Sequence, residues 1–303
     1  MIYQPLFRIL NFKEKLRSCF THLKDKPIFN YHTITLLLII HLILGYRRLR
    51  DIEHYKDDPM VKRILGLNLL PDVSTVSRIM SKLDDKCIVK NRQLNCDFVI
   101  ARLKKLNLKR ITLDFDGSVC FTKGKYAEGT AVGFNKKKKG SRSYYPLFCT
   151  VAQTCQVLDV LHRPGNVHDS RGAKEFMEQC IAAIRKSLPN ILIEIRMDSA
   201  FFNEKIVFML EDMSIEFTAS VPFERFHELK HMIERRKRWN RLNDIWSYFE
   251  NRWKPKKWPE KFRFIFIRQK AKKIRKEPIQ LELFVPYDYK YEFKVCVTNK
   301  KIN

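Results

Sequence analysis

The chain has 303 residues, of which 59 are lysine or arginine and 33 are aspartate or glutamate, so its formal net charge is +26. Its apolar fraction of 45% is that of an ordinary globular protein, which excludes wholesale disorder. So large an excess of positive charge favours a polyanionic partner, through electrostatic steering and counterion release, and nucleic acid is the first candidate.

Eight cysteines are scattered along the chain without any Cys-x-x-Cys pair. This pattern predicts reduced thiols, not a disulfide framework or a zinc site. The longest apolar stretch, Ile34 to Leu44, is too short to span a bilayer. Residues 1–10 lack the apolar core and the cleavage site of a signal peptide. The sequence therefore predicts a cytoplasmic protein that has no membrane partner.

The N-terminal third has the pattern of a helical domain. Residues 1–30 are expected to form an irregular arm, and the apolar segment Tyr31–Tyr46 predicts a buried helix. A short helix is expected from Pro59 to Gly66, and Asp72 or Ser74 can cap the helix that follows. Two short helices joined by a turn with glycine resemble a DNA-reading helix-turn-helix, and they equally fit two core helices of a helical cap.

Two carboxylates end the next expected strand. The strand Ile111–Asp116 carries Asp114 and Asp116, and Gly117 and Ser118 then end the run. Because side chains alternate along a strand, both carboxylates leave the same face. Such a pair suits Mg²⁺, which prefers hard oxygen ligands. It also fits a solvated strand end with an Asp-Gly turn.

The elements that follow predict a fold class. Strands are expected at Tyr145–Gln153, Val157–Arg163, Ile191–Met197 and Ile215–Val221, and helices at Ser170–Ser187 and Glu204–Met213. The order β-β-β-α-β-α-β resembles the mixed sheet of an RNase H-like α/β fold. In that fold the catalytic carboxylates lie on the first strand and at the end of the fourth, where Asp114, Asp116 and Asp198 fall.

The segment after Val221 differs in composition. Residues 223–276 hold 19 Lys or Arg against 6 Asp or Glu, and they contain all four tryptophans of the chain. Trp239, Trp246 and Trp253 are seven residues apart, a spacing that returns to nearly the same helix face and predicts a helix up to Trp253. Further strands are expected at Phe262–Arg268, Leu281–Val285 and Tyr291–Thr298.

Five motifs in this order resemble the DDE transposases of the IS4 superfamily, and most closely its IS1380 group. The motifs are Leu113 to Ser118, Tyr144 to Leu147, Leu161 to His168, Ile195 to Phe201 and Val297 to Asn299. The resemblance covers residues 55–303. It implies an N-terminal helical DNA-binding domain (1–108), an RNase H-like catalytic core (109–222), and a basic, Trp-rich helix-plus-strand insertion that leads into the C-terminal part of the core (223–303).

The resemblance also implies a chemistry. Asp116 and Asp198 would hold Mg²⁺ (or Mn²⁺) ions that support phosphodiester hydrolysis and strand transfer in DNA transposition. Asp114 is the alternative to Asp116 as the first ligand. The family's third acid is a glutamate in a Tyr-x₂-Arg-x₃-Glu signature after the Thr-Asn strand, and no such signature precedes Asn303. This predicts a truncated chain with an incomplete, catalytically impaired site.

The implied partners are double-stranded DNA, as transposon ends and as target, and a second copy of the chain on paired ends. Arg163, Asn166 and His168 would lie beside the scissile phosphate; the alternative is that Arg163 shapes its loop by hydrogen bonds. One tryptophan of the basic segment would stack on an unpaired base, unless these tryptophans pack a core. The remaining predicted DNA contacts are Lys136, Lys137, Lys138, Lys139, Arg235, Arg236, Lys237 and Arg238.

Two other functions fit parts of the sequence. The first is a non-catalytic DNA-binding remnant that inhibits transposition. The second is a haloacid dehalogenase-like phosphatase, in which Asp114 would be the covalent nucleophile and Asp116 the general acid/base. That fold requires a helix after the first strand, whereas the sequence predicts more strands.

Overall fold

The structure, a computed structural model, describes residues 3–25, 27–124, 126–133, 138–222, 225–271, 286, 288 and 290–301. The chain divides into two compact units, Met1–Phe98 and Val99–Asn303. The predicted strand Leu281–Val285 lies outside the described residues, as do Lys136 and Lys137. No helix in the described part of the chain is long and apolar enough to cross a membrane.

Short helices build the N-terminal unit. They are α1 (Tyr3–Ile9), α2 (Phe12–Ser18), α3 (Tyr31–Ile43), the 3₁₀ helix η1 (Leu49–His54), α4 (Pro59–Leu65), α5 (Val73–Met80) and the start of α6 (Asp85–Leu106). The prediction of an irregular arm over residues 1–30 is wrong, since α1 and α2 lie there. Leu16, Cys19 and Phe20 are buried, so the packing of a few apolar side chains stabilises these short helices. The basic residues between them obscured the helical spacing of the apolar residues in the sequence.

The predicted ends of α4 and α5 are confirmed. Gly66 follows α4 with a φ of 73°, a left-handed conformation that glycine adopts at little cost. Asp72 caps α5, because its Oδ1 accepts a hydrogen bond of 2.6 Å from the backbone N–H of Thr75. Turn chemistry therefore placed these helices correctly from sequence.

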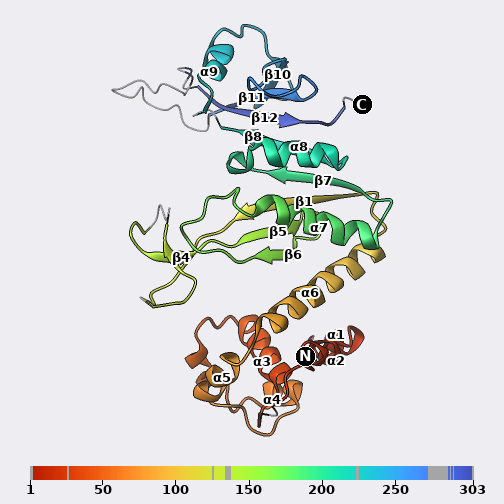
Figure 1. The fold of residues 1–303 in the computed structure, drawn as a ribbon, viewed down its shortest axis with the longest axis vertical. Coiled ribbons are helices and arrows are strands. Elements are labelled where there is room, and N and C mark those ends of the chain that lie inside the picture. Colours follow the sequence, from red (N-terminus) through yellow and green to blue (C-terminus); the bar gives the residue numbers. More distant parts are fainter. Residues whose placement is uncertain are drawn as a thin grey trace. The chain divides into compact units, whose positions relative to one another are not determined.

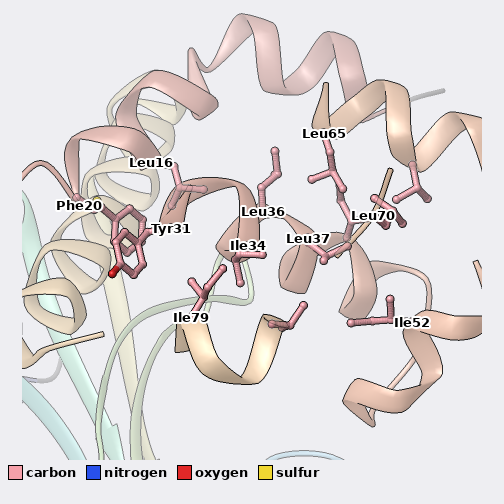
Figure 2. Packing of buried hydrophobic residues seen from close by; sticks show 14 of the residues in the cluster. Leu16, Phe20, Tyr31, Ile34, Leu36, Leu37, Ile52, Leu65, Leu70 and Ile79 are labelled. Atoms are coloured by element: carbon pink, nitrogen blue, oxygen red, sulfur yellow. The ribbon is translucent and has the colours of Figure 1, made fainter. Parts of the chain in front are cut away.

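Helix α3 is the centre of the N-terminal core. Leu36 and Leu37 are 2% and 0% exposed, and they face apolar side chains of η1, α4 and α5 (Figure 2). Ile52, Leu65 and Ile79 complete this part of the core. The nearly uniform apolar sequence of α3 reflects contact on most of its sides.

The second unit is organised around a mixed sheet whose described strands run in the order β6-β5-β1-β7-β8-β12-β11-β10-β9 (Figure 1). The first five are β1 (Arg110–Gly117), β5 (Leu147–Val151), β6 (Gln156–Leu161), β7 (Leu192–Met197) and β8 (Glu216–Val221). β1, β5 and β6 are joined antiparallel, whereas β7 is parallel to β1 and β8 is parallel to β7. This topology confirms the RNase H-like prediction. It excludes the phosphatase alternative, because an antiparallel hairpin follows β1.

Helices α7 (Ala173–Ser187) and α8 (Glu204–Asp212) pack on this sheet, α7 against β5 and β6 and α8 against β8 (Figure 1). The ring of Phe176 meets Phe115 of β1 edge-on at 5.9 Å. The predicted helix Ser170–Ser187 is confirmed as α7, and its buried residues recur at helical spacing: Ala173, Phe176, Met177, Cys180, Ile181 and Ile184. Their burial holds the strands, and hence the strand ends, in a fixed arrangement.

The described part of the basic segment holds more strand than helix, and the predicted long Trp helix is wrong. Helix α9 spans only His227–Glu234, and β9 (Asn240–Arg241), β10 (Trp246–Asn251) and β11 (Arg263–Lys270) follow. β12 (Tyr291–Thr298) pairs with β11 and with β8. The seven-residue spacing of the tryptophans was misleading because Trp246 lies in strand β10, which pairs with β11. This long-range strand pairing determines the local structure, and the helical period of the tryptophans is a coincidence.

A small sheet that the sequence did not predict joins the loop after β6. Its described strands are β2 (Cys120–Phe121), β4 (Arg142–Tyr144) and β3 (Ala131–Val132), and Tyr144 forms a bridge with Pro164. Gly133 and Gly165 approach so closely that a Cβ on Gly133 would overlap the Gly165 carbonyl. This close approach fixes the loop that follows β6.

Candidate active site at the ends of two parallel strands

Two adjacent parallel strands carry charged side chains in the same register. Asp114 of β1 and Arg196 of β7 are Cα partners, and Arg196 donates from Nε and Nη2 to the two carboxylate oxygens of Asp114, both at 2.7 Å. Asp116 and Asp198 each lie two residues further along these strands. Since side chains alternate, this step returns to the face of the Asp114–Arg196 pair and brings two carboxylates together where the strands end.

The Asp198 carboxylate is in an anionic environment. Its pKa is raised, first by partial desolvation and then by the negative charges of Asp169 and Asp116. Asp198 also caps the 3₁₀ helix η2 (Ser199–Phe201), because its Oδ1 accepts from the backbone N–H of Ala200 at 2.9 Å. Asp116 and Asp198 both remain exposed to solvent. Accessible carboxylates that repel one another suit the binding of a cation.

Asp169 is the member of this group that sequence reasoning missed. It lies in the loop between β6 and α7, and its Oδ1 would be 2.8 Å from a Cβ built on Gly117. The side chain of Asp169 therefore packs against the strand end, next to Asp116. The sequence feature that could have identified Asp169 is its position directly after the motif that ends at His168.

Arg163 shapes this loop, as the alternative interpretation of the sequence held. It is 5% exposed, so it is not a free phosphate-binding side chain. Its guanidinium donates to the carbonyl oxygens of Tyr145 (3.0 Å), Asp169 (2.8 Å) and Arg171 (3.0 Å). Burial lowers the pKa of Arg163. The predicted DNA contact at Arg163 thus has to be replaced by a role in loop structure.

Asn166 and His168 lie in the same loop, and both are exposed. The Nδ1 of His168 lies 3.0 Å from the hydroxyl of Ser170 and accepts from the Ser170 backbone N–H at 3.3 Å. These bonds turn the chain just before α7. Contact of Asn166 and His168 with DNA stays a prediction.

The other predicted DNA contacts are surface residues. Lys138 and Lys139 are exposed, and the Lys138 Nζ lies 3.9 Å from the ring centre of Phe121. Arg235, Arg236, Lys237 and Arg238 are exposed in the connection between α9 and β9. They offer positive charge beside the β-structure that extends the sheet.

The tryptophans of this region pack against other side chains. Trp239 meets Phe249 edge-on at 4.7 Å, and the Arg268 guanidinium lies 4.6 Å from the Trp239 ring. Trp258 is 5% exposed and stacks on Phe202 at 4.8 Å. For these two tryptophans, core packing is the interpretation that the geometry favours over stacking on a base.

His22, Asp84 and Cys87 form a separate group in the N-terminal unit, with one ligand atom of each within 4.8 Å of the others. His22 Nε2 lies 2.9 Å from Asp84 Oδ1, and Asp84 caps α6 through the backbone N–H of Cys87. The Lys90 Nζ is 3.3 Å from Nδ1 of the same imidazole. The Lys90 ammonium therefore already lies where a cation bound to His22 Nδ1 would lie. We interpret the group as a helix cap that links His22, which precedes α3, to α6.

The cap makes a pH-dependent contribution to stability. The hydrogen bond from His22, followed by the cap itself, holds the pKa of Asp84 well below its ordinary value. A carboxyl group whose pKa is lower in the folded state stabilises the fold at pH values above its unfolded pKa of about 3.9. This contribution is lost as the pH falls through the folded-state pKa. Asp84→Asn is therefore expected to be less stable than wild type in urea at pH 7, with the difference shrinking below about pH 4. Asp85→Asn, one residue later, is the control.

Among the described residues, only that N-terminal group places three His, Cys, Asp or Glu ligand atoms within 4.8 Å of one another. Asp116, Asp169 and Asp198 are therefore spread more widely, although their charges interact. Mutual repulsion between carboxylates explains this separation.

The sequence of the chain matches the family described as transposase DDE domain group 1 over residues 1–278. No curated protein matches it. A solved structure of the piggyBac transposase synaptic complex with hairpin DNA is similar over 97% of this chain, with a TM-score of 0.46 and 11% identity. This chain corresponds to 58% of that piggyBac chain, which is less than two thirds of its length.

Two other transposase structures are similar to smaller shares of the chain. The Drosophila P element transposase strand transfer complex aligns with 71% of this chain and 43% of its own, at a TM-score of 0.32 and 14% identity. The Mos1 mariner paired-end complex with Mn aligns with 69% of this chain and 66% of its own, at a TM-score of 0.27 and 11% identity.

Proposed function

Since the chain belongs to the group 1 family of transposase DDE domains, we propose that it binds double-stranded DNA at the ends of a mobile element and that its acids support hydrolysis of phosphodiester bonds there. The impaired catalysis that the sequence predicts stays a prediction. A divalent cation held by Asp116 and Asp198 is part of this proposal. We further propose, from the resemblance of its five motifs, that the chain is a member of the IS4 superfamily near the IS1380 group. The observation that carries the proposal is the pair of accessible carboxylates at the ends of β1 and β7.

The donor set fits a hard cation. Asp116 and Asp198 offer carboxylate oxygens, which suit Mg²⁺ and Mn²⁺ and are poor ligands for softer metals. Asp114 is committed to its two hydrogen bonds with Arg196, so Asp116 is the better first ligand. When bound, such a cation activates an attacking hydroxyl and stabilises the leaving oxygen of the phosphodiester.

The protein's own residues supply the rest of the site. Backbone pairing of β1 with β7 sets the spacing of the two strand ends, and the exposed Asp114–Arg196 pair adds a side-chain contact two residues before the acids. Arg163 holds the loop that carries Asp169 beside them, and Asn166 and His168 belong to the same loop. These interactions position the carboxylates before DNA arrives, which reduces the reorganisation required for the reaction.

Positive charge supports the DNA part of the proposal. We propose that Arg235 and Lys237 contact phosphates, since both are exposed in a chain of net charge +26. In the N-terminal unit, the exposed face of α5 presents Ser74, Ser77 and Arg78 while Val76 and Ile79 are buried. That face is the proposed contribution of α4 and α5 to DNA binding. A second copy of the chain on paired ends is part of the same proposal.

Salt dependence tests the DNA contact. Affinity for a duplex is expected to fall steeply as salt rises, because each neutralised phosphate releases counterions. Arg235→Ser combined with Lys237→Ser should reduce the slope of log affinity against log salt by up to about 2. Lys174→Ser, which removes a lysine that faces Glu178 on α7, should leave the slope unchanged. An equal slope in both variants would remove the α9–β9 connection from the interface.

Nicking tests the chemistry. The chain is expected to nick a supercoiled plasmid that carries element ends when Mg²⁺ or Mn²⁺ is present, and EDTA should stop the reaction. Salt-dependent binding without nicking in either metal would reject hydrolysis. It would instead support the second candidate function, DNA binding without cleavage.

A further inference from the structure

Two arginines of the candidate site are already engaged within the protein. Arg163 is buried among backbone carbonyls, and Arg196 is paired with a carboxylate on its own face of the sheet. The charges that raise the pKa of Asp198 are those of Asp169 and Asp116, both negative. A DNA strand that passes these acids therefore needs positive charge for its flanking phosphates as well as at the cation site.

The third parallel strand, β8, leads to an exposed arginine at the same edge of the sheet. β8 is parallel to β7 and pairs with it, so both strands end at the edge that carries Asp116 and Asp198. Pro222 directly follows β8, and its carbonyl accepts a hydrogen bond of 3.4 Å from the backbone N–H of Arg225. In open α/β sheets, ligands bind outside the carboxyl ends of such strands. Arg225 therefore lies at the edge where the proposed chemistry takes place.

The side chain of Arg225 is anchored one turn away from Asp198. Its Nη1 donates to the carbonyl oxygen of Phe202 at 3.3 Å. Phe202 directly follows η2, the 3₁₀ helix that Asp198 caps. Since a 3₁₀ helix rises about 2.0 Å per residue, the anchor lies about 8 Å along the chain axis from Asp198. Successive phosphates of one DNA strand advance by about 3.4 Å along the duplex, so the guanidinium is placed for a phosphate about two nucleotides from the acids.

Aromatic packing holds this anchor in place. Phe226 meets Phe202 edge-on at 5.7 Å and Trp253 edge-on at 4.8 Å, and Phe202 is buried. Arg225 itself is exposed. Within the described part of the chain, its guanidinium contacts the Phe202 carbonyl and no carboxylate. A carbonyl leaves the positive charge unneutralised, and the planar fork keeps further N–H donors for phosphate oxygens.

We propose that Arg225 binds a DNA phosphate about two nucleotides from the scissile bond, the kind of contact that the sequence predicted for Arg163. The inference rests on the proposed function, because it requires that the phosphodiester bond is cleaved at Asp116 and Asp198. The guanidinium positions the DNA strand across the ends of β1, β7 and β8. Its charge also offsets the repulsion between the phosphates and the acids at this edge.

Neutralising one phosphate at a time tests this contact. The position at which the full chain nicks a plasmid with element ends is mapped first. Duplexes of that sequence are then made with a single uncharged methylphosphonate at each position around the nick. Wild type is expected to lose about 10–100-fold in affinity at one position near the nick, the factor for a hydrogen bond to a charged group. Arg225→Gln should lose nothing further at that position and should keep the wild-type losses at the others.

Nicking rates and a matched control complete the test. Arg225→Gln is expected to nick about 10–100-fold more slowly than wild type. Arg225→Lys should be intermediate, because lysine keeps the charge and lacks the planar fork. Arg185 also donates to a backbone carbonyl, that of Met213, which precedes β8 and so lies at the opposite end of that strand. Arg185→Gln should therefore nick as wild type does. The melting temperature of Arg225→Gln should equal that of wild type.

Three outcomes overturn the inference. If wild type nicks DNA and Arg225→Gln shows the same nicking rate and the same methylphosphonate losses, Arg225 binds no phosphate and the proposed function stands without it. A lower melting temperature with unchanged methylphosphonate losses would assign Arg225 to the anchoring of η2 alone. If wild type nicks no DNA, the proposed function itself is wrong and the inference falls with it.

Discussion

Replacing Asp116 or Asp198 with asparagine is expected to lower Mg²⁺-dependent nicking at least about 100-fold, since changes to residues that only orient metal ligands already cost 10–100-fold. Affinity for duplex DNA should persist or rise, because each substitution removes a negative charge near phosphate. The two activities should therefore separate: cleavage is lost and binding is kept.

Asp114→Asn is the matched control for this prediction. Asp114 lies on the same strand face as Asp116 and carries the same charge, but its two oxygens accept from Arg196. The substitution should weaken that exposed pair and change nicking far less than Asp116→Asn does. Nicking of the plasmid and a filter-binding titration on the same preparations give both numbers. A larger loss in Asp114→Asn than in Asp116→Asn would reverse the assignment of the first ligand.

Leu37→Ala is expected to destabilise the N-terminal unit by about 2–5 kcal/mol, the range for truncating a buried leucine. Leu37 is 0% exposed at the centre of α3, and the cavity would lie between α3 and the helices packed on it (Figure 2). Small units have total stabilities of about 5–15 kcal/mol, so this loss is a large fraction of the whole.

The control lies on the same helix. Leu42 is 67% exposed, and Leu42→Ala should change stability by no more than about 0.5 kcal/mol. All four tryptophans lie in the second unit, so tryptophan fluorescence reports on that unit, whereas the helical circular dichroism signal comes from both units. An earlier urea midpoint in dichroism for Leu37→Ala, with fluorescence unchanged, is the expected result. Equal midpoints in the two leucine variants would contradict the core assignment.

Local rules predicted those parts of the fold that local chemistry determines. Gly66 and Asp72 mark helix ends because a left-handed cap and a carboxylate cap each need particular residues. The apolar face of α7 was read from its spacing, since it packs on one sheet. Alternation on β1 correctly placed Asp114 and Asp116 on one face.

Long-range contacts explain the failures. The heptad of tryptophans could not reveal that Trp246 pairs with a strand about twenty residues later, where Gln269 is its partner. The burial of Arg163 depends on carbonyl groups that separate loop segments bring around it. Asp169 was missed because its proximity to Gly117 arises from the small sheet and the loop after β6, neither of which has a sequence period.

The order of strands in the large sheet has a consequence for biosynthesis. Each segment that brings Asp116, Asp169 and Asp198 together precedes residue 222, whereas β9 to β12 extend only the far side of the sheet, beyond β8. Chains emerge from the ribosome N-terminus first, and folding of early segments does not await later ones. The acids can thus assemble while the most basic stretch of the polypeptide is still being translated, so the anionic centre is shaped before the basic connection between α9 and β9 exists.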